Sequence, residues 1–360
     1  MSKQQTSRFQ IDSKSLIQKD ITLAGFTTLG IGGRAKWFCR ASNLEEVCFA
    51  IEFAAQVGAP VLFLGGGSNL VISDEGFKGL VIFNQIKGRQ IIHEDEETAT
   101  IRIKSGENWD QFVQWAVERN YCGIESLSGI PGTVGGTPIQ NVGAYGQEVS
   151  DVITSVEALE LPACRMKKFL QDECGFSYRK SRFNTSDKNK YFIYSVEFTL
   201  RKNSEPRITY PELKSELPPD PTIKDIRNTV INIRKRKSMV IDENDRNSRS
   251  VGSFFKNPII NSESVERIEK VVGQSPPQFP QTDRMVKIPA AWLIEKAGFN
   301  KGYRAGNVGI SENHTLALVN FGGGTAEELI SLAKTIRLRV SQKFGILLEA
   351  EPTLIGVTLD

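Results

Sequence analysis

The sequence predicts an α+β fold, and three observations support this class. Helical and strand-like patterns follow one another irregularly, not in the strand–helix alternation of a parallel α/β sheet. Two glycine-rich loops, at residues 64–70 and 128–146, match neither of the phosphate-binding loops typical of that parallel class. A length of 360 residues is enough for two or three domains.

Two segments carry complete helix signals. Residues 42–58 and 326–344 each combine apolar residues at helical spacing with a capping-box pattern at the start and a glycine at the end. The caps are Ser42 with Glu45 and Thr325 with Glu328, and the glycines are Gly58 and Gly345.

Two further helices are predicted from apolar stripes. Residues 108–119 place Phe112, Trp115 and Arg119 along one face. Residues 225–237 have a basic outer side and end in the cationic run 234–237, which by itself is more often a solvated helix end than a binding site.

Short apolar runs predict the strands. Residues 61–64 follow a proline and lead directly into the first glycine loop, as a buried strand would. We also read residues 242–250 as an exposed loop, because they are polar. Further strands are predicted at 79–83, 98–104, 152–160, 191–200 and 352–359, with breaks in composition near 84–98 and 203–222.

The bulk composition excludes several classes of function. A net charge of +3 over the whole chain gives no reason to expect a nucleic-acid partner. The polar residues 1–10 resemble neither a secretory signal nor a membrane anchor, and there is no long apolar run. Five scattered cysteines without paired spacing indicate a reducing, cytoplasmic environment and argue against a zinc site, so we expect no metal.

The two glycine-rich loops are the strongest functional signal. Glycine lets main-chain N–H groups approach a ligand closely, and successive N–H groups can bind an anion. The loops therefore favour a large phosphate-bearing cofactor, with two flexible turns as the alternative. Residues 64–70 lack the Gly-Lys-Ser/Thr ending of a P-loop, and the G-x-G-x-x-G pattern of a Rossmann site is missing as well.

The order of the motifs resembles the UDP-N-acetylenolpyruvoylglucosamine reductase family, from about residue 20 to residue 357. Several such motifs in the right order are far more specific than one. They are Thr28–Gly33, Leu64–Leu70, Ser128–Gly146, Gly175–Ser181, Gly252–Pro258, Ala291–Glu295 and Leu348–Glu351.

This resemblance implies a non-Rossmann FAD-binding fold of the vanillyl-alcohol-oxidase type with a separate α+β substrate-binding domain. Residues 1–84 would form the first FAD-binding subdomain, and residues 85–238 plus 345–360 the second. Residues 239–344 would bind the substrate. The Thr209–Leu213 segment resembles the loop of the subclass whose tyrosine closes over the substrate.

The resemblance also implies the chemistry. NADPH reduces a non-covalent FAD, a hydride passes to the vinyl carbon of the enolpyruvyl ether, and a proton follows at the carbon beside the carboxylate. The product, UDP-N-acetylmuramate, serves peptidoglycan synthesis. The partners implied are thus the UDP-sugar and NADPH, with no nucleic acid, membrane or obligatory protein partner.

Three residues are candidates for catalysis by this resemblance. Arg179 can hold a carboxylate in two-point contact and stays charged. Glu351 can stabilise the developing enolate only if it is protonated. Ser253 is the candidate proton donor. Without the resemblance, each of these three residues would be interpreted as an ordinary polar residue of the surface or of a turn.

The remaining site residues follow from the same motifs. The residues implied in FAD binding are Gly65, Gly66, Gly67, Ser68, Asn69, Leu70, Ser128, Gly129, Ile130, Pro131, Gly132, Thr133, Asn141, Gly143, Ala144 and Tyr145. Those implied in substrate binding are Tyr178, Tyr210, Lys237 and Asn257.

Some positions depart from the family pattern. Ser250-Val251 replaces the usual Asn-Ala, the segment from Lys237 to Ser253 is several residues longer, and Ala350 stands where proline is common. Two other functions stay open at this point. One is a sugar or alcohol oxidase of the same flavin superfamily, and the other is a catalytically silent nucleotide-binding module.

Overall fold

The computed structural model describes residues 16–360, and these residues form two compact units of mixed α and β structure. Unit 1 consists of Ala35–Gly66, Lys78–Arg234 and the segment ending at Ile21. Unit 2 consists of Thr22–Arg34, Gly67–Phe77 and Lys235–Asp360. The predicted division at residues 84, 238 and 345 stays a prediction. The reading of residues 1–10 lies outside the described residues.

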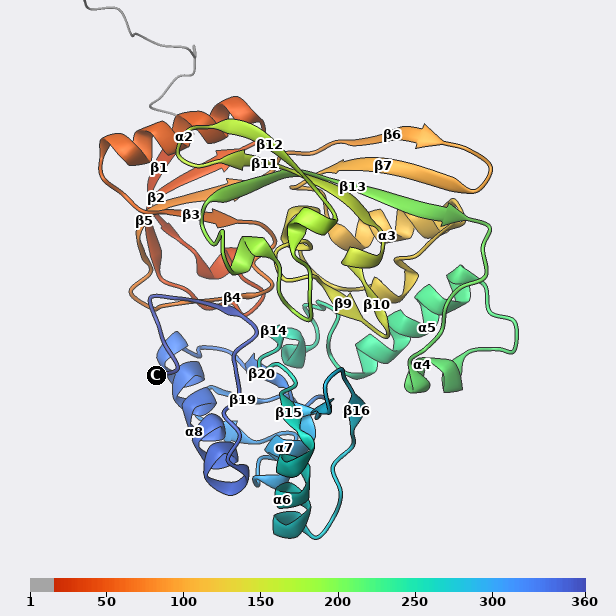
Figure 1. The fold of residues 1–360 in the computed structure, drawn as a ribbon. Coiled ribbons are helices and arrows are strands. Elements are labelled where there is room, and N and C mark those ends of the chain that lie inside the picture. Colours follow the sequence, from red (N-terminus) through yellow and green to blue (C-terminus); the bar gives the residue numbers. More distant parts are fainter. Residues whose placement is uncertain (1–15) are drawn as a thin grey trace, which may run out of the picture. The chain divides into compact units, whose positions relative to one another are not determined.

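The first sheet of unit 1 has four strands in the order β1-β2-β5-β3 and is covered by helix α2 (Figure 1). Ala50, Ile51 and Ala54 of the helix pack into an apolar cluster with Leu80 and Ile82 of the sheet. The elements are β1 Ile17–Thr22, β2 Arg34–Ala41, α2 Leu44–Gln56, β3 Val61–Leu64 and β5 Phe77–Asn84.

Helix α2 was predicted, but its cap lies one residue further along than expected. Asn43 is the N-cap, and its side chain accepts a hydrogen bond from Glu46 N at 2.9 Å. The Glu46 carboxylate in turn accepts from Ser42 N at 2.6 Å. The predicted pair of Ser42 and Glu45 is therefore wrong, because Asn43 competes for the same position and is at least as good a cap.

The second sheet of unit 1 is antiparallel, in the order β12-β11-β13-β7-β6, with β8 paired to β13. Helix α3 lies along it, and Trp109, Phe112 and Val113 of the helix enter its core (Figure 1). The elements are β6 Arg89–Glu94, β7 Thr98–Lys104, α3 Trp109–Glu118, β8 Tyr121–Cys122, β11 Ile153–Glu160, β12 Arg165–Leu170 and β13 Tyr191–Lys202.

Two details of this sheet differ from the prediction. Residues 84–98 are not a break in structure, because they contain the edge strand β6, which pairs with β7 and is exposed along its length. In α3, Arg119 is exposed and not part of the buried stripe. Its guanidinium instead lies 4.4 Å from the centroid of the half-buried Trp115 ring. Both regions carry charges because they face solvent.

The rest of unit 1 consists of short elements that connect these sheets to helix α5. Ile226, Val230 and Ile233 of α5 pack with Leu213 of α4 in a small apolar cluster. The elements are β9 Gly143–Ala144, β10 Gln147–Glu148, α4 Pro211–Glu216 and α5 Ile223–Arg236, and 3-10 turns lie at Glu125–Leu127, Val134–Gly136, Val149–Asp151, Asp172–Cys174 and Arg182–Asn184.

Unit 2 is built around a four-stranded sheet in the order β14-β20-β19-β18, with helices α6, α7 and α8 around it (Figure 1). A small sheet, β15-β17-β16, and the parallel pair β21-β4 complete it. The elements are β4 Leu70–Ile72, β14 Ser250–Ser253, β15 Ile259–Asn261, α6 Ser262–Val272, β16 Phe279–Pro280, β17 Met285–Lys287, α7 Ala290–Lys296, β18 Arg304–Ala305, β19 Val308–Ile310, β20 Ala317–Asn320, α8 Ala326–Phe344 and β21 Thr353–Ile355, with 3-10 turns at Ala24–Phe26 and Arg246–Ser248.

Helix α8 has the bounds and caps that its sequence predicts. Thr325 and Glu328 form the capping box, and Gly345 ends the helix with a left-handed φ of 69°. Asp74 also stabilises the start of this helix, which the sequence does not show. Its carboxylate accepts hydrogen bonds from Ala326 N (2.9 Å) and Glu327 N (3.0 Å), and so stabilises the positive end of the helix.

Two predictions in unit 2 were too simple. Only Thr353–Ile355 of the predicted terminal strand 352–359 is a strand, because the residues after it leave the ladder and pack on the core. The polar loop 242–250 is not fully exposed. Asn247 and Ser248 are buried, and the Ser248 hydroxyl donates to Asp242 O at 2.8 Å. Their polarity serves internal hydrogen bonds.

Candidate active site

The loop after β3 meets the 128–133 loop through bare backbone. A Cβ atom at Gly66 would lie 2.6 Å from Gly132 Cα, and one at Gly65 would lie 2.6 Å from Thr133 Oγ1. A side chain at Gly66 would collide with main chain, and one at Gly65 would have to displace the Thr133 hydroxyl. The structure therefore brings these two predicted cofactor segments of unit 1 together with little side chain between them, and glycine backbone of this kind suits a dinucleotide cofactor.

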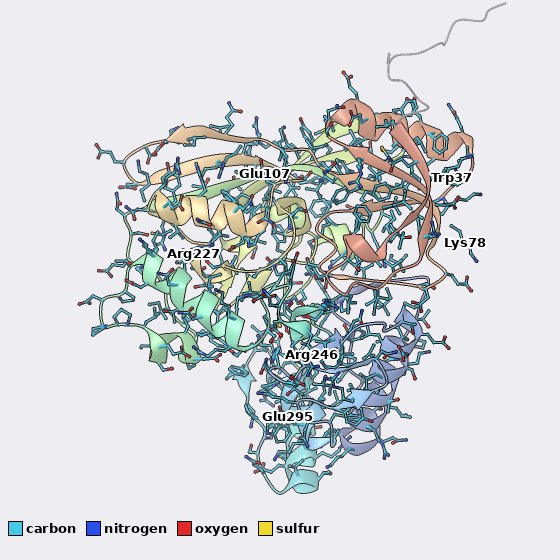
Figure 2. All side chains as sticks on the ribbon, turned by 180° about the vertical axis from the view of Figure 1, so that it is seen from behind. Trp37, Lys78, Glu107, Arg227, Arg246 and Glu295 are labelled. Carbon is cyan, nitrogen blue, oxygen red and sulfur yellow. The ribbon has the colours of Figure 1, made fainter. Side chains whose placement is uncertain are left out.

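The carboxylate of Asp110 anchors the 128–133 loop. Asp110 Oδ1, in the first turn of α3, accepts from Gly129 N at 2.6 Å. The same carboxylate forms a two-point ion pair with Arg227 of α5, at 2.7 and 3.0 Å (Arg227 is labelled in Figure 2). Burial opposes ionisation of Asp110, but the hydrogen bonds from Arg227 and Gly129 outweigh it, so the pKa of the carboxyl lies below its usual range. The loop is thus anchored by a carboxylate that is ionised at neutral pH.

Some predicted cofactor residues serve the loop itself. The Ser128 hydroxyl is buried and donates to Glu125 O at 2.7 Å. Ile130 packs against the apolar core. The Asn141 side chain donates to Glu148 Oε2 (2.7 Å) and to Ser177 O (3.2 Å). The side chains of these residues therefore hold the loop in shape.

Arg179 occupies a hairpin turn beside the 143–145 segment. Its φ of 57° is left-handed, which is uncommon for a side chain of this size. Ser177 and Lys180 close the turn with two main-chain hydrogen bonds of 3.0 Å. The Arg179 guanidinium donates to Gly143 O at 2.9 Å and lies 5.4 Å from the Tyr178 ring centroid. Arg179, Tyr178 and Gly143 are therefore neighbours in unit 1.

The predicted closing tyrosine also lies against this segment. The rings of Tyr210 and Tyr145 meet edge to face, with centroids 5.3 Å apart. Burial raises the pKa of Tyr145 to about 12, against the opposing charge of Arg234, and burial also raises the pKa of Tyr210. Both phenols are thus neutral hydrogen-bonding groups at physiological pH.

Arg234 is a residue whose importance the sequence reading missed. It is only 7% exposed, its side chain hydrogen-bonds Tyr145, and burial lowers its pKa. The cationic run 234–237 by itself predicts a solvated helix end, and the buried Arg234 departs from that prediction. The seven-residue spacing between Arg227 and Arg234 could have indicated that both lie on the inner face of α5.

In unit 2, Gly67 packs on the turn that contains Phe26 and Thr28. Gly67 has a φ of 62°, its carbonyl accepts from Thr28 N at 3.2 Å, and a Cβ at this position would collide with Phe26 O. Asn69, two residues on, binds the segment of the predicted catalytic glutamate, because Asn69 Nδ2 donates to Glu351 O at 3.4 Å and Thr353 N donates to Asn69 O at 2.9 Å. Ser68 is half-buried and Leu70 begins β4.

The segments that carry Ser253 and Glu351 run side by side in unit 2. Glu351 N donates to Phe254 O at 2.8 Å, and Lys256 N donates to Glu349 O at 3.0 Å. Ser253 ends β14, after Gly252, whose φ is 78°. The rings of Phe254 and Phe255 are buried in the core, while Ser253 and Glu351 are only partly buried. The Ser253 hydroxyl and the Glu351 carboxyl are therefore carried by two neighbouring segments that are joined by main-chain hydrogen bonds.

Two predicted substrate residues of unit 2 have different surroundings. Asn257 Oδ1 accepts from Ala290 N at 2.9 Å and so supports the start of α7. Lys237 is half-buried and precedes Ser238, whose φ is 54°. Asn313 Nδ2 donates to Ser238 Oγ at 2.8 Å, which fixes the chain just after Lys237. The amide group of Asn257 and the Lys237 ammonium are thus on anchored segments.

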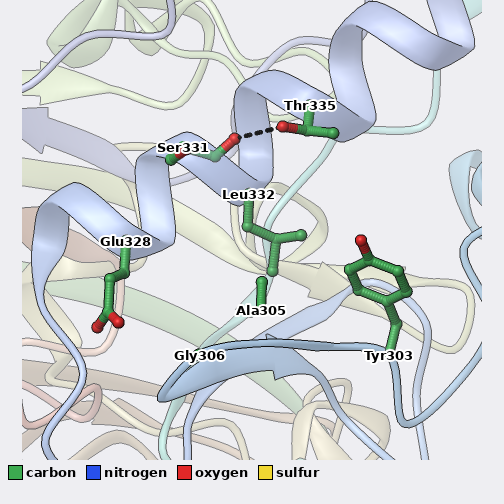
Figure 3. Close-up of a pocket in the computed structure, with 7 residues that line it drawn as sticks. All are labelled: Tyr303, Ala305, Gly306, Glu328, Ser331, Leu332 and Thr335. Carbon is green, nitrogen blue, oxygen red and sulfur yellow. Dashed lines mark hydrogen bonds between the residues drawn. The ribbon is translucent and has the colours of Figure 1, made fainter.

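A cavity of about 270 Å³ lies elsewhere in unit 2, between β18 and α8 (Figure 3). It contains none of the predicted site residues, and we assign it no part in the reaction. Its lining residues are Tyr303, Ala305, Gly306, Glu328, Ser331, Leu332 and Thr335.

Residues 16–360 contain no helix long and apolar enough to cross a bilayer. They also contain no group of three or more His, Cys, Asp or Glu side chains that could hold a metal ion.

Comparison with protein families gives two matches. The model described as "UDP-N-acetylenolpyruvoylglucosamine reductase, C-terminal domain" matches residues 244–355, and the one described as "FAD binding domain" matches residues 35–166. The second match supports the reading of the glycine-rich loops as cofactor-binding elements.

Individual proteins are similar over almost the whole chain. The UDP-N-acetylenolpyruvoylglucosamine reductase of Thermobifida fusca is 43% identical over 352 residues, covering 95% of this chain and 98% of that protein. The enzyme of the same name from Flavobacterium johnsoniae is 37% identical, covering 94% and 99%. The crystal structure of the Thermus caldophilus reductase aligns with a TM-score of 0.64 at 26% identity, covering 94% and 99%. The predicted non-Rossmann, FAD-binding α+β fold is confirmed.

Proposed function

Because the chain belongs to the UDP-N-acetylenolpyruvoylglucosamine reductase family, we propose that it reduces this enolpyruvyl sugar nucleotide to UDP-N-acetylmuramate with NADPH as electron donor. The chain is accordingly an FAD-dependent oxidoreductase of peptidoglycan precursor synthesis. The observation that carries the finer proposal is the pairing of Glu351 N with Phe254 O, which keeps the predicted proton donor and the predicted acid on neighbouring segments.

FAD would be held without a covalent bond by main chain of the loops at 65–70, 128–133 and 143–145. The contact at Gly66 supports this role, because it lets the main chain of the first two loops pack directly together. Bound FAD would supply the hydride for the alkene, and the protein orients the reactants and controls charge.

Arg179 would bind the substrate carboxylate. The guanidinium is planar, permanently charged and already directed by its bond to Gly143 O, so little ordering remains when the carboxylate binds. Negative charge grows on this carboxylate as hydride arrives at the vinyl carbon. A donor placed for such charge is typically worth about 3–4 kcal/mol.

Glu351 would act on the same carboxylate as a protonated acid. In that form it donates a hydrogen bond to the developing enolate, whereas the ionised form would repel it. Its main chain is fixed on both sides, by the bonds to Phe254 O and Asn69 Nδ2. A fixed position favours a group that must act in one geometry.

Ser253 would give its hydroxyl proton to the carbon beside the carboxylate. A serine hydroxyl is a weak acid, but the accepting carbon belongs to a strongly basic enediolate, so the transfer is feasible. Gly252 supports this role, because its positive φ turns the end of β14 in a way that an L side chain rarely adopts. The proton would be replaced from solvent, since Ser253 is only partly buried.

The UDP-sugar would be bound by two tyrosines, a lysine and an amide. Lys237 would bind the diphosphate, and Asn257 would assist through its Nδ2. Tyr178 would line the pocket and Tyr210 would contact the substrate. The 37% exposure of Tyr210 leaves its ring accessible to a ligand.

Steady-state turnover tests this proposal. Purified protein should be yellow, and should oxidise NADPH only when the enolpyruvyl sugar nucleotide is present, with UDP-N-acetylmuramate as product by mass spectrometry. NADPH oxidation driven by oxygen alone, or by a sugar or alcohol in its place, would identify an oxidase of the same superfamily and overturn the proposal.

A further inference from the structure

Two thiols meet where α2 packs on the β11–β12 hairpin of unit 1. Cys48 lies on α2 and Cys164 in the turn that precedes β12, and both side chains border the apolar cluster of Ala50, Ile51 and Leu159. Figure 1 shows this hairpin beside α2. The side chains of Cys48 and Cys164 are close enough to interact with each other.

The surroundings of this pair differ from those of the other cysteines. Cys39, Cys122 and Cys174 are buried, whereas Cys48 and Cys164 are both partly exposed. Both members of the pair are therefore partly open to solvent. The separation of 116 residues in sequence (164 − 48) explains why the spacing of the cysteines gave no hint of it.

We propose that Cys48 and Cys164 form a reversible disulfide when the protein meets a small-molecule disulfide such as oxidised glutathione. No step of the proposed reductase reaction uses either thiol. The crosslink would join α2 to the β11–β12 hairpin within unit 1.

The disulfide would form in two exchange steps that conserve atoms and electrons. Cys48 Sγ, as thiolate, attacks one sulfur of the small disulfide, which forms a mixed disulfide and releases one small thiol. Cys164 Sγ then attacks Cys48 Sγ, the protein disulfide forms, and the second small thiol leaves. The protein loses two hydrogens and is oxidised, and the small disulfide is reduced to two thiols.

The order of attack follows from the relative ease of ionisation of the two thiols. The interaction between the two side chains favours the Cys48 thiolate over the Cys164 thiolate. Burial raises the pKa of Cys48 above its usual range and that of Cys164 to about 12, so oxidation at neutral pH is slow. Proximity then favours closure of the second bond over accumulation of the mixed disulfide.

Intact-mass and peptide analysis test the proposal on the full chain with FAD bound. After incubation with oxidised glutathione, wild type should lose two hydrogens, keep no glutathione and yield one crosslinked peptide pair containing residues 48 and 164. Cys164→Ser should instead hold one stable glutathione on Cys48. Cys122→Ser is the matched control and should behave as wild type.

The crosslink should also raise the midpoint of thermal unfolding in wild type, reversibly with dithiothreitol, and not in Cys48→Ser. A stable glutathione adduct on wild type, a crosslink through another cysteine, or five thiols that remain free would overturn the proposal. These readouts are independent of turnover, so they do not depend on the proposed function.

Discussion

At the scale of single residues, the account depends on what Ser253 does. Its segment is fixed by Phe254, whose N–H donates to Leu316 O at 2.8 Å and whose carbonyl accepts from Glu351 N. Replacing the hydroxyl by a methyl group should therefore remove the proton donor without moving the backbone.

We expect Ser253→Ala to leave reduction of FAD by NADPH unchanged and to slow flavin reoxidation by the substrate by about 10²–10⁴-fold, the usual effect of losing a general acid. Ser331→Ala, at an exposed position on α8, is the matched control. Rapid-mixing absorbance at the flavin band measures both half-reactions. If both rates in Ser253→Ala stayed near wild type, the proton would come from elsewhere.

Arg179 allows a test of geometry apart from charge. Arg179→Lys keeps a cation but loses the planar two-point contact and the directed bond to Gly143 O. Turnover should fall about tenfold or more, since part of the charge stabilisation remains. The neighbouring exposed Lys180→Arg should leave the kinetic parameters unchanged. Equal turnover of Arg179→Lys and wild type would mean that the Arg179 guanidinium does not hold the substrate carboxylate in a two-point contact.

At the scale of elements, Asp110 connects α3, the 128–133 loop and α5. Asp110→Asn keeps an oxygen for Gly129 N but removes the charge that Arg227 pairs with, and the Arg227 side chain is only 13% exposed. The loop should lose rigidity, because a half-paired buried cation disturbs its support.

FAD affinity measures this effect. Asp110→Asn should raise the dissociation constant of FAD about tenfold, equivalent to about 1.4 kcal/mol, in a fluorescence titration of the apoprotein. The exposed Glu118→Gln on the same helix is the control. Unchanged affinity would show that the loop holds its shape without this anion.

The polar face of the second sheet carries an ion-pair network around Glu197 on β13. The carboxylate is 7% exposed and contacts Arg102 and Lys168, and it accepts from Ser155 Oγ at 2.6 Å. Burial opposes its ionisation, but the bonds from Ser155, Lys168 and Arg102 outweigh it and lower the pKa of Glu197 to about 2.

A lowered pKa gives a definite sign to the pH dependence. Ionised Glu197 stabilises the fold above its ordinary value of 4.5, and this contribution is lost as the pH falls toward about 2. Glu197→Gln should therefore lower the free energy of unfolding by about 2 kcal/mol at neutral pH and much less at about pH 3. Urea unfolding at the two pH values measures this difference.

The control for this change is Glu160→Gln, which removes an ion pair with the largely exposed Arg165 on the same sheet. Such a pair contributes about 0.5 kcal/mol or less. Equal losses in the two variants, or a Glu197→Gln loss that did not shrink in acid, would contradict the assignment.

At the scale of the whole molecule, the sequence predicted what local chemistry decides. Thr325 and Glu328 signal the start of α8 and Gly345 signals its end, each from within the adjoining turn, and the helix begins and ends where they indicate. The glycine loops were recognisable for the same reason, because the direct approach of Gly132 main chain requires glycine at position 66.

The rest depends on contacts between distant segments. The edge strand β6 lies in what the sequence shows only as a break in composition, because its pairing with β7 is what makes it a strand. The burial of Arg234, the anchoring of Gly129 by Asp110 and the meeting of Cys48 with Cys164 likewise arise from packing. The predicted site residues came from family resemblance, and their roles stay predictions.

The measurement that tests the central claim most directly is an anaerobic stopped-flow experiment with two half-reactions. NADPH should bleach the bound flavin, and the enolpyruvyl sugar nucleotide, mixed with the reduced protein, should restore its absorbance within one turnover. A protein that stays colourless in the presence of FAD, or a reduced flavin that oxygen reoxidises and the sugar nucleotide does not, would contradict the account.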